Sequence, residues 1–196
     1  MNKTKIFTGT IIIPTYPEPA AEEVPMFAEN RVHQRSSGRP YPNKVVMQVD
    51  RTHKEDKEYK LVTLENEYVK IEILPEIGGR IYSAYDKTTG YDYFYKQHVI
   101  KPALIGVLGS WISGGVEFNW PFHHRASGFM PCDFTIEEMP DGSAACHLSE
   151  HDPIDRMKGM VSVILKPDET CLETRMRLYN RTSTEKSFLW WENAAV

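Results

Sequence analysis

Residues 67–86 read EYVKIEILPEIGGRIYSAYD, and this stretch carries the pattern that decides the fold. Val69, Ile71 and Ile73 alternate with more polar neighbours, which is the period of a β-strand that buries one face. Pro75 ends the run, and the glycine pair at residues 78–79 opens the next stretch, GGRIYSAYD. The pattern therefore predicts β structure interrupted by a tight corner at the glycines.

The same alternation recurs along the rest of the chain from about residue 60. It is clear at residues 161–165 and 172–178 and weaker at 134–136 and 144–148. Turn-forming residues separate these runs at 87–90, 140–142, 166–168 and 180–182. No helical period extends beyond two turns. We therefore predict an all-β fold, an antiparallel β-sandwich, in which residues 172, 174, 176 and 178 form a buried strand face.

Composition limits the classes of function. The chain has 196 residues, a net charge of -4, 41% hydrophobic and 26% charged residues. It lacks the basic excess expected of a nucleic-acid-binding protein, and no apolar run reaches the ~18 residues of a membrane span. The three cysteines, Cys132, Cys146 and Cys171, have no metal-like spacing. We interpret them as reduced thiols, buried or half-buried, in a cytoplasmic protein, and we predict neither a metal site nor a cofactor.

The chain divides into two regions by composition. Residues 1–57 contain short β-like pieces around a proline-rich stretch with little periodicity, which is typical of an extended arm or a long surface loop. Residues 58–196 contain the alternating runs. We therefore expect an N-terminal arm at 1–57 and a β-sandwich at 58–196.

Chemically rich side chains gather in GGVEFNWPFHHR, residues 114–125. Alternation places Glu117 and Asn119 on one face of this strand, and Val116, Phe118 and Trp120 on the other. A carboxylate beside an amide suits the recognition of vicinal hydroxyl groups. The same pair also suits an ordinary strand face exposed to solvent, and the residues alone leave both interpretations open.

Further candidates surround this pair. His123 and His124 are adjacent, so at most one of them shares a face with Glu117. Arg80 follows a glycine pair at the start of a strand, where it can reach into a concave surface or form a salt bridge. The tryptophans Trp120, Trp190 and Trp191 are candidates for an aromatic platform, and one of the last two is expected in the core. Glycoside chemistry requires a second carboxylate, for which the candidates are Glu76, Asp133 and Glu192.

Five segments together resemble the DUF5107 family. They are LENEY (64–68), LPEIGGRIY (74–82), DKTTG (86–90), WISGGVEFN (111–119) and WENAAV (191–196). The resemblance runs from about residue 58 to residue 196. It implies a galactose mutarotase-like β-supersandwich and a carbohydrate-facing surface. Members of the family are typically large bacterial proteins in which this module precedes further β-sandwich and tetratricopeptide repeats.

The galactose mutarotase-like fold implied by the resemblance is also that of the aldose epimerases, and this sequence differs from those enzymes in two respects. In those enzymes a Thr-Asn-His-like motif supplies a histidine, whereas here Ala194 follows Glu192 and Asn193 at that place. Their catalytic glutamate comes later than this sequence extends. The standard epimerase mechanism is therefore not predicted. A complete supersandwich needs on the order of 250 residues, so we expect the N-terminal part of one, whose apolar residues 188–191 cause self-association.

These observations favour carbohydrate recognition by a mutarotase-like domain within a larger glycan-processing protein. The alternative is a structural or protein-interaction β-sandwich with a vestigial sugar cleft. Whether the protein is an enzyme stays open. The candidate catalytic residues are Glu117 and His124, and the candidate sugar-binding residues are Arg80, Asn119, Trp120, His123 and Glu192.

Overall fold

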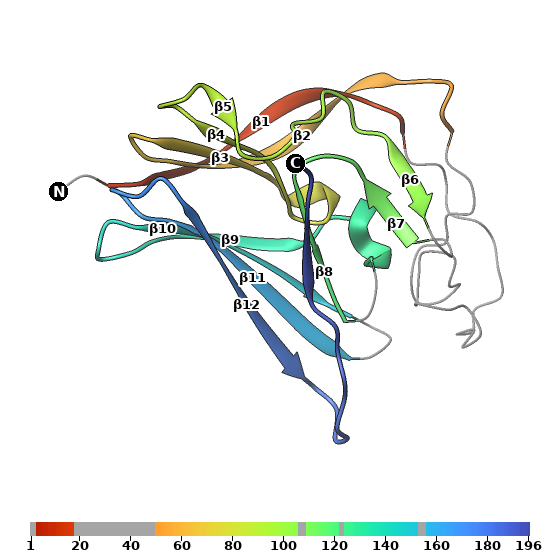
Figure 1. The fold of residues 1–196 in the computed structure, drawn as a ribbon. Helices are drawn as coiled ribbons and strands as arrows, with labels where there is room; N and C mark the ends of the chain where they lie inside the picture. Colours follow the sequence, from red (N-terminus) through yellow and green to blue (C-terminus); the bar gives the residue numbers. More distant parts are fainter. Residues whose placement is uncertain (1–2, 18–49, 106–108, 122–123, 153–155) are drawn as a thin grey trace.

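The computed structural model of the protein describes residues 3–17, 50–105, 109–121, 124–152 and 156–196, in which nearly every regular element is a β-strand (Figure 1). The strands are β1 (Lys5–Thr15), β2 (Glu55–Glu65), β3 (Val69–Leu74), β4 (Arg80–Asp86), β5 (Tyr91–Asp92), β6 (Pro102–Ile105), β7 (Gly109–Ile112), β8 (Val116–Asn119), β9 (Asp133–Glu138), β10 (Ala144–His151), β11 (Met157–Leu165), β12 (Leu172–Asn180) and β13 (Trp191–Ala194). Two short 3₁₀ turns, η2 (Pro75–Ile77) and η3 (Ala126–Phe129), are the helical elements of these ranges. The prediction of an all-β fold is confirmed.

The strands form two layers. Within the described ranges, a large sheet of seven strands has the order β1-β2-β3-β4-β8-β13, with β5 paired to β4, and a small sheet has the order β12-β11-β10-β9. The hairpin β6–β7 forms a separate two-stranded sheet. All the strand pairings in these three sheets are antiparallel. Figure 1 shows β9–β12 as a layer below the large sheet.

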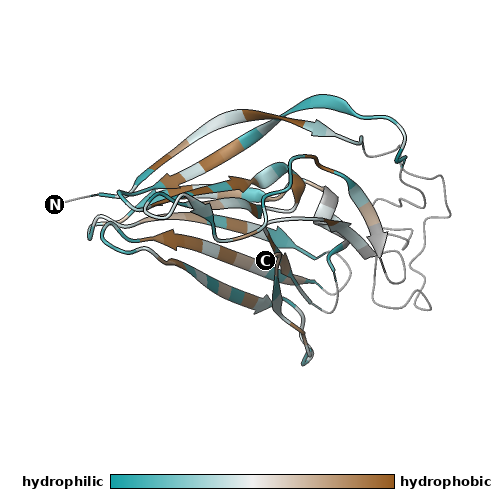
Figure 2. Cartoon of the chain, turned by 45° about the horizontal axis from the view of Figure 1, so that its top comes forward, coloured by the Kyte–Doolittle hydropathy of each residue, from teal (hydrophilic) through white to brown (hydrophobic). Residues whose placement is uncertain are grey.

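The main core lies between the two sheets. Alternate residues of the large sheet, such as Val62, Ile71 and Phe118, pack in one cluster with Cys146 and Val163 of the small sheet. Hydrophobic and hydrophilic residues alternate along the strands in Figure 2, as the period of two requires. Each buried aliphatic or aromatic side chain stabilises the fold by roughly 1.5–3 kcal/mol. The sandwich is therefore held mainly by the facing sides of the two sheets.

The opposite, outer face of the large sheet is also covered in part. A second hydrophobic cluster joins Tyr59 and Leu61 of β2 and Tyr82 of β4 to Ile100 and to Ile112 of β7. The turn η3 contacts β7 and η2. Polar residues of the central strands therefore lie beneath this second layer rather than on an open sheet surface.

One boundary and the burial of one strand differ from the sequence-based expectation. The boundary expected at residue 57 falls inside β2, and β1 pairs with β2 along its whole length, so the N-terminal β piece belongs to the sandwich. The proline-rich part at residues 18–49 lies outside the described ranges. Residues 172, 174, 176 and 178 do share the inward face of β12, but they are half-buried and not buried. The reason is that β12 is an edge strand of the small sheet.

Two of the three cysteines have the burial expected from the sequence. Cys146 is buried, Cys132 is half-buried, and burial raises the pKa of their thiols to about 12 and about 11 respectively, so both stay protonated at neutral pH. Cys171 is exposed, which corrects the expectation for that residue.

Phe188 and Leu189 are exposed, while Trp190 packs against the core. Self-association through residues 188–191 stays a prediction. Within the described ranges, no helix has the length and apolar character of a membrane span.

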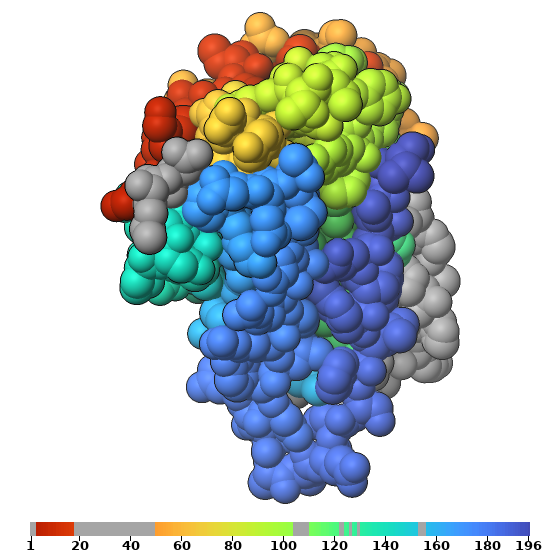
Figure 3. Space-filling model, turned by 60° about the vertical axis from the view of Figure 1, so that its left-hand side comes forward, coloured from red at the N-terminus to blue at the C-terminus, as the bar shows by residue number. Residues whose placement is uncertain are grey.

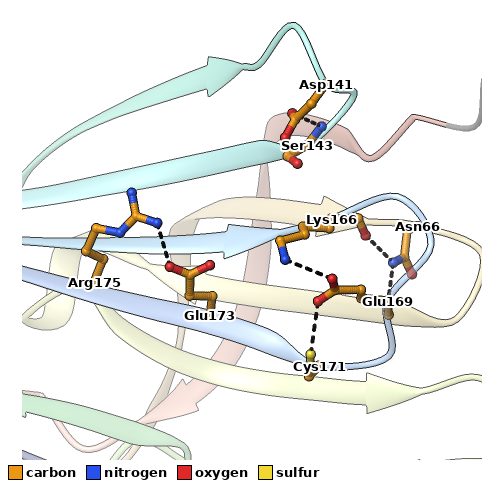
Figure 4. A network of polar contacts seen from close by, with 8 residues as sticks. All are labelled: Asn66, Asp141, Ser143, Lys166, Glu169, Cys171, Glu173 and Arg175. Carbon is orange, nitrogen blue, oxygen red and sulfur yellow. Dashed lines mark hydrogen bonds and ion pairs between the residues drawn. The ribbon is translucent and has the colours of Figure 1, made fainter.

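Asn66 joins the two sheets at one end of the sandwich. Its Nδ2 donates to the backbone oxygens of Lys166 (2.7 Å) and Glu169 (2.8 Å), in the turn between β11 and β12. Its Oδ1 accepts from the backbone N–H groups of Tyr68 (2.8 Å) and Val69 (2.7 Å), where β3 begins. Figure 4 shows Asn66 pointing at this turn, within a larger polar network. The side chain of Asn66 therefore connects the turn between β2 and β3 in the large sheet to the turn between β11 and β12 in the small sheet.

We expect Asn66→Ala to lower the free energy of unfolding by about 1–3 kcal/mol, because it leaves the buried N–H of Val69 and three partly buried backbone groups without this partner. The matched control is Asn180→Ala. Asn180 makes comparable turn bonds to Thr182 and Thr184, but they are exposed and lie within one loop. Urea denaturation followed by circular dichroism measures both. An equal loss in the two variants would contradict the role of Asn66 as a link between sheets.

Candidate functional site

Strand β8 turns its polar residues towards the outer face of the large sheet. Val116 and Phe118 are buried in the core between the sheets, so alternation places Glu117 and Asn119 on the other face. Both polar side chains are themselves buried. The structure thus separates the two faces of β8 as the sequence pattern predicts, but it encloses Glu117 and Asn119 instead of exposing them.

Glu117 forms a hydrogen-bonded pair with His124. The Nδ1 atom of His124 lies 2.9 Å from Oε2 of Glu117, and Nδ2 of Asn193 donates to the same oxygen over 3.3 Å. An ionised carboxylate only accepts hydrogen bonds, so Nδ1 of His124 carries the proton that it donates to Glu117. A carboxylate on one ring nitrogen sets the tautomer and the orientation of the imidazole.

The charge state of Glu117 follows from its surroundings. Burial raises the pKa of this carboxyl group, but the hydrogen bonds from His124 and Asn119, with a smaller contribution from the positive charge of Arg80, outweigh burial and hold the pKa below its ordinary value. Glu117 is therefore ionised at neutral pH. Burial lowers the pKa of Arg80 to about 10, against the opposing effect of Glu117, so the guanidinium stays charged. Nη2 of Arg80 donates to the backbone oxygen of Gly114 (3.0 Å).

Strand β13 completes the cluster. Its register places Asn193 opposite Glu117 and Trp191 opposite Asn119, so these side chains share the outer face. The ring of Trp191 meets that of His124 edge to face, with centroids 5.6 Å apart and an interplanar angle of 88°. We call Arg80, Glu117, His124, Trp191 and Asn193 the Glu117 cluster. Asn193 was not selected from the sequence. Once the register between β13 and β8 is known, the alternation of side chains along β13 places Asn193 on the same face as Glu117.

Arg125 borders this cluster and was also missed. It is buried, its guanidinium lies 4.1 Å from the ring centroid of Trp120, and its Nη2 donates to the backbone oxygen of Gly78 (2.5 Å). Its Nη1 forms an ion pair with Glu150. The backbone N–H of Arg125 donates to Oδ1 of Asn119 (3.3 Å). Arg125 therefore fixes the segment that follows β8 against the glycine corner before β4.

Asn119 lies on the same face of β8 as Glu117 and is fully buried. Its Oδ1 accepts from the backbone N–H of Arg125, and its side chain helps to hold the pKa of Glu117 below the ordinary value. Asn119 therefore supports the ionised state of Glu117 from the neighbouring position of the strand.

The remaining candidates lie elsewhere. Trp120 is buried in the core cluster on the opposite face, so its ring offers no open platform for a ligand. Glu192 alternates with Asn193 and faces away from Glu117, where it accepts a hydrogen bond from Oγ1 of Thr174 (2.6 Å). His123 lies outside the described residues.

The candidates for a second carboxylate make their hydrogen bonds away from Glu117 or lie in the other sheet, and their role stays a prediction. Glu76 accepts a hydrogen bond from the backbone N–H of Lys60 (2.5 Å), and Asp133 begins β9 in the small sheet. Among the described residues, no group of three or more His, Cys, Asp or Glu side chains is arranged to hold a metal ion.

Fold and cluster together define an antiparallel β-sandwich whose larger sheet carries, on its outer face, a buried and ionised glutamate hydrogen-bonded to a histidine. The model of the family described as domain of unknown function (DUF5107) matches residues 38–196, and the chain belongs to this family. A crystal structure of a TPR-domain containing protein from Parabacteroides distasonis has a similar fold, with a TM-score of 0.84 and 23% sequence identity. The match covers 98% of this chain and 32% of that one, so the chain spans about a third of that protein's length.

Proposed function

We propose that the protein recognises a carbohydrate at the Glu117 cluster, as a galactose mutarotase-like module of a larger glycan-processing protein. The observation that carries this proposal is the buried, ionised carboxylate of Glu117, bonded to His124 and Asn193 beside the ring of Trp191. Sites for small molecules combine a few placed polar groups with aromatic surface in this way. A carboxylate and an amide bind hydroxyl groups, and an aromatic ring contacts the apolar face of a pyranose.

The pairing of Glu117 with His124 also suits proton transfer. A carboxylate that orients an imidazole is a common arrangement for a general acid or base, because one ring nitrogen is held by the carboxylate while the other is left to exchange a proton. In a sugar-active protein, we assign proton transfer to His124 and its orientation to Glu117. The hydrogen bonds from His124 and Asn119 keep Glu117 ionised, and the charge of Arg80 adds to their effect.

A structural or protein-interaction module is the second candidate, and one observation favours it. Arg80 and Arg125 both donate to backbone oxygens of the glycine corners, at Gly114 and Gly78. Glu117 already accepts two hydrogen bonds from within the protein. Such mutual pairing is also what a purely architectural polar network requires.

The test of carbohydrate recognition is the affinity of Glu117→Gln. An array of mono- and oligosaccharides identifies the sugar, and calorimetry with that sugar compares the variant with the wild type. We expect the fold to persist, because one oxygen becomes an amide of the same size. We expect binding to weaken by about 1–3 kcal/mol, because a charge-assisted hydrogen bond is lost.

The matched control is Glu192→Gln, which makes the same chemical change on the opposite face of β13 and should leave the affinity unaltered. Equal affinities for wild type and Glu117→Gln would place recognition outside the cluster. An array on which no sugar binds would favour the structural module.

A further inference from the structure

A groove of about 560 Å³ lies beside the hairpin formed by β4 and β5. We call it the tyrosine groove, and the residues used in the argument are Tyr85, Tyr91, Asp92, Tyr95, Lys96 and His98. In Figure 3 the lime-green surface that contains this segment adjoins the dark-blue end of the chain. The groove volume falls within the range typical of small-molecule sites, about 300–1,000 Å³.

Three aromatic rings in the groove are exposed. The exposed fraction is 76% for Tyr91, 52% for Tyr95 and 40% for Tyr85. These three rings do not contribute to the core of the sandwich, whereas the neighbouring Phe94 packs against it. Tyrosine combines an apolar face with a hydroxyl group, and exposed clusters of such residues mark binding surfaces.

The backbone beneath the rings is held in place. Tyr85 pairs with Asp92 and Asp86 with Tyr91 in the β4–β5 ladder. The N–H of Tyr95 donates to the oxygen of Ala195 (2.9 Å), and the oxygen of Tyr95 accepts from the N–H of Gly115 (2.9 Å). The groove is therefore built on a fixed backbone, which lowers the entropic cost of binding a ligand.

The charges of the groove exclude some ligands. The ammonium group of Lys96 is paired with Glu72 at 2.9 Å, and Oδ1 of Asp92 accepts from Oγ of Ser83 at 2.6 Å. Lys70 pairs with the same Glu72 at 2.7 Å, so two lysines share one carboxylate, and Asp92 adds a second carboxylate in the wall of the groove. The groove therefore has no excess of positive charge to attract a phosphate or another anion. Aromatic faces beside polar side chains suit a neutral, polyhydroxylated ligand.

The tyrosine groove lies close to the Glu117 cluster along the last residues of the chain. Val196 lines the groove, and Asn193 belongs to the cluster three residues earlier in the same extended segment. At a rise of about 3.3 Å per residue, the two positions lie within roughly 10 Å of one another. A ligand of two or more sugar units spans such a separation, whereas a single sugar does not.

We propose that the tyrosine groove is a second subsite, which binds further sugar units of an oligosaccharide held at the Glu117 cluster. This inference rests on the proposed function and narrows its ligand class from any sugar to an oligosaccharide. Tyr91, with the most exposed ring of the three, supplies the main stacking surface.

The experiment uses calorimetry with an oligosaccharide found on the array and with the monosaccharide from its end. We expect Tyr91→Ala to weaken binding of the oligosaccharide at least tenfold and to leave binding of the monosaccharide unchanged. Tyr91→Phe keeps the ring and should keep most of the affinity. Tyr179→Ala removes another exposed tyrosine ring, 46% exposed against 76% for Tyr91, from β12 and serves as the control.

The outcomes separate the two proposals. Unchanged oligosaccharide affinity in Tyr91→Ala, together with a loss in Glu117→Gln, would overturn the second subsite and leave the proposed function standing. A loss in Tyr91→Ala with no effect of Glu117→Gln would overturn recognition at the Glu117 cluster and, with it, the description of the groove as a second subsite. Binding of a proline-rich peptide that the sugar does not compete with, lost in Tyr91→Ala, would show that the groove serves a protein partner and would also overturn the inference.

Discussion

Gly115→Ala should cost the protein on the order of 4 kcal/mol or more of its free energy of unfolding, which is exceptional for one methyl group. Gly115 has a φ of +67°, where a Cβ atom costs about 1–2 kcal/mol. The added Cβ would also lie 1.9 Å from the backbone oxygen of Ile81 and 3.3 Å from Cα of Tyr82. These atoms belong to β4, which pairs with β8, so the two central strands must move apart.

The matched control is Gly90→Ala. Gly90 has a similar φ of +75°, but the atom nearest to a Cβ added at this position is Oη of Tyr85, at 3.7 Å. We expect this variant to lose only the backbone contribution of about 1–2 kcal/mol. Chemical denaturation followed by circular dichroism compares the two. Equal losses would mean that β4 and β8 do not approach closely at Gly115.

Val116→Asp is the second substitution with a large expected effect. Val116 is 2% exposed and faces the core between the sheets. A carboxylate at this position has no partner, and an uncompensated buried charge costs about 3–5 kcal/mol in addition to the lost apolar contacts. We therefore expect Val116→Asp to be largely unfolded near room temperature, as measured by thermal denaturation and near-UV circular dichroism.

Ile12→Asp provides the control, because Ile12 is a β-branched residue in a strand but is 63% exposed. Its loss should stay within about 1 kcal/mol. Glu117→Gln, one residue from Val116, should remain folded. A Val116→Asp protein as stable as Ile12→Asp would reverse the assignment of the two faces of β8.

Local patterns were sufficient for the strands and for their faces. A strand's side chains alternate whatever lies next to it, so Val116 and Glu117 could be assigned to opposite faces from residues 116–120 alone. The same reasoning identified the inward face of β12. It could not set the degree of burial, because that depends on the edge position of β12 in the small sheet.

The composition of the Glu117 cluster was only partly predictable. Glu117, Arg80 and His124 were selected for their chemistry and do lie together. Glu192 was selected in place of its neighbour Asn193, because the register between β13 and β8 decides which of the two faces Glu117. That register joins residues 76 positions apart in the chain. A shift of one residue would exchange the two side chains.

The sequence by itself determined the all-β class, the alternation of buried and polar residues, and the type of chemistry available on β8. These properties depend on a period of two and on turn residues, which act over a few positions. Only the tertiary structure decided that the outer face of the large sheet is covered, that Trp120 is core, and that Trp191 and Asn193 join Glu117 and His124. The physical reason is that burial and partnership depend on strand order and on the second layer, which are set by contacts between residues distant in the chain.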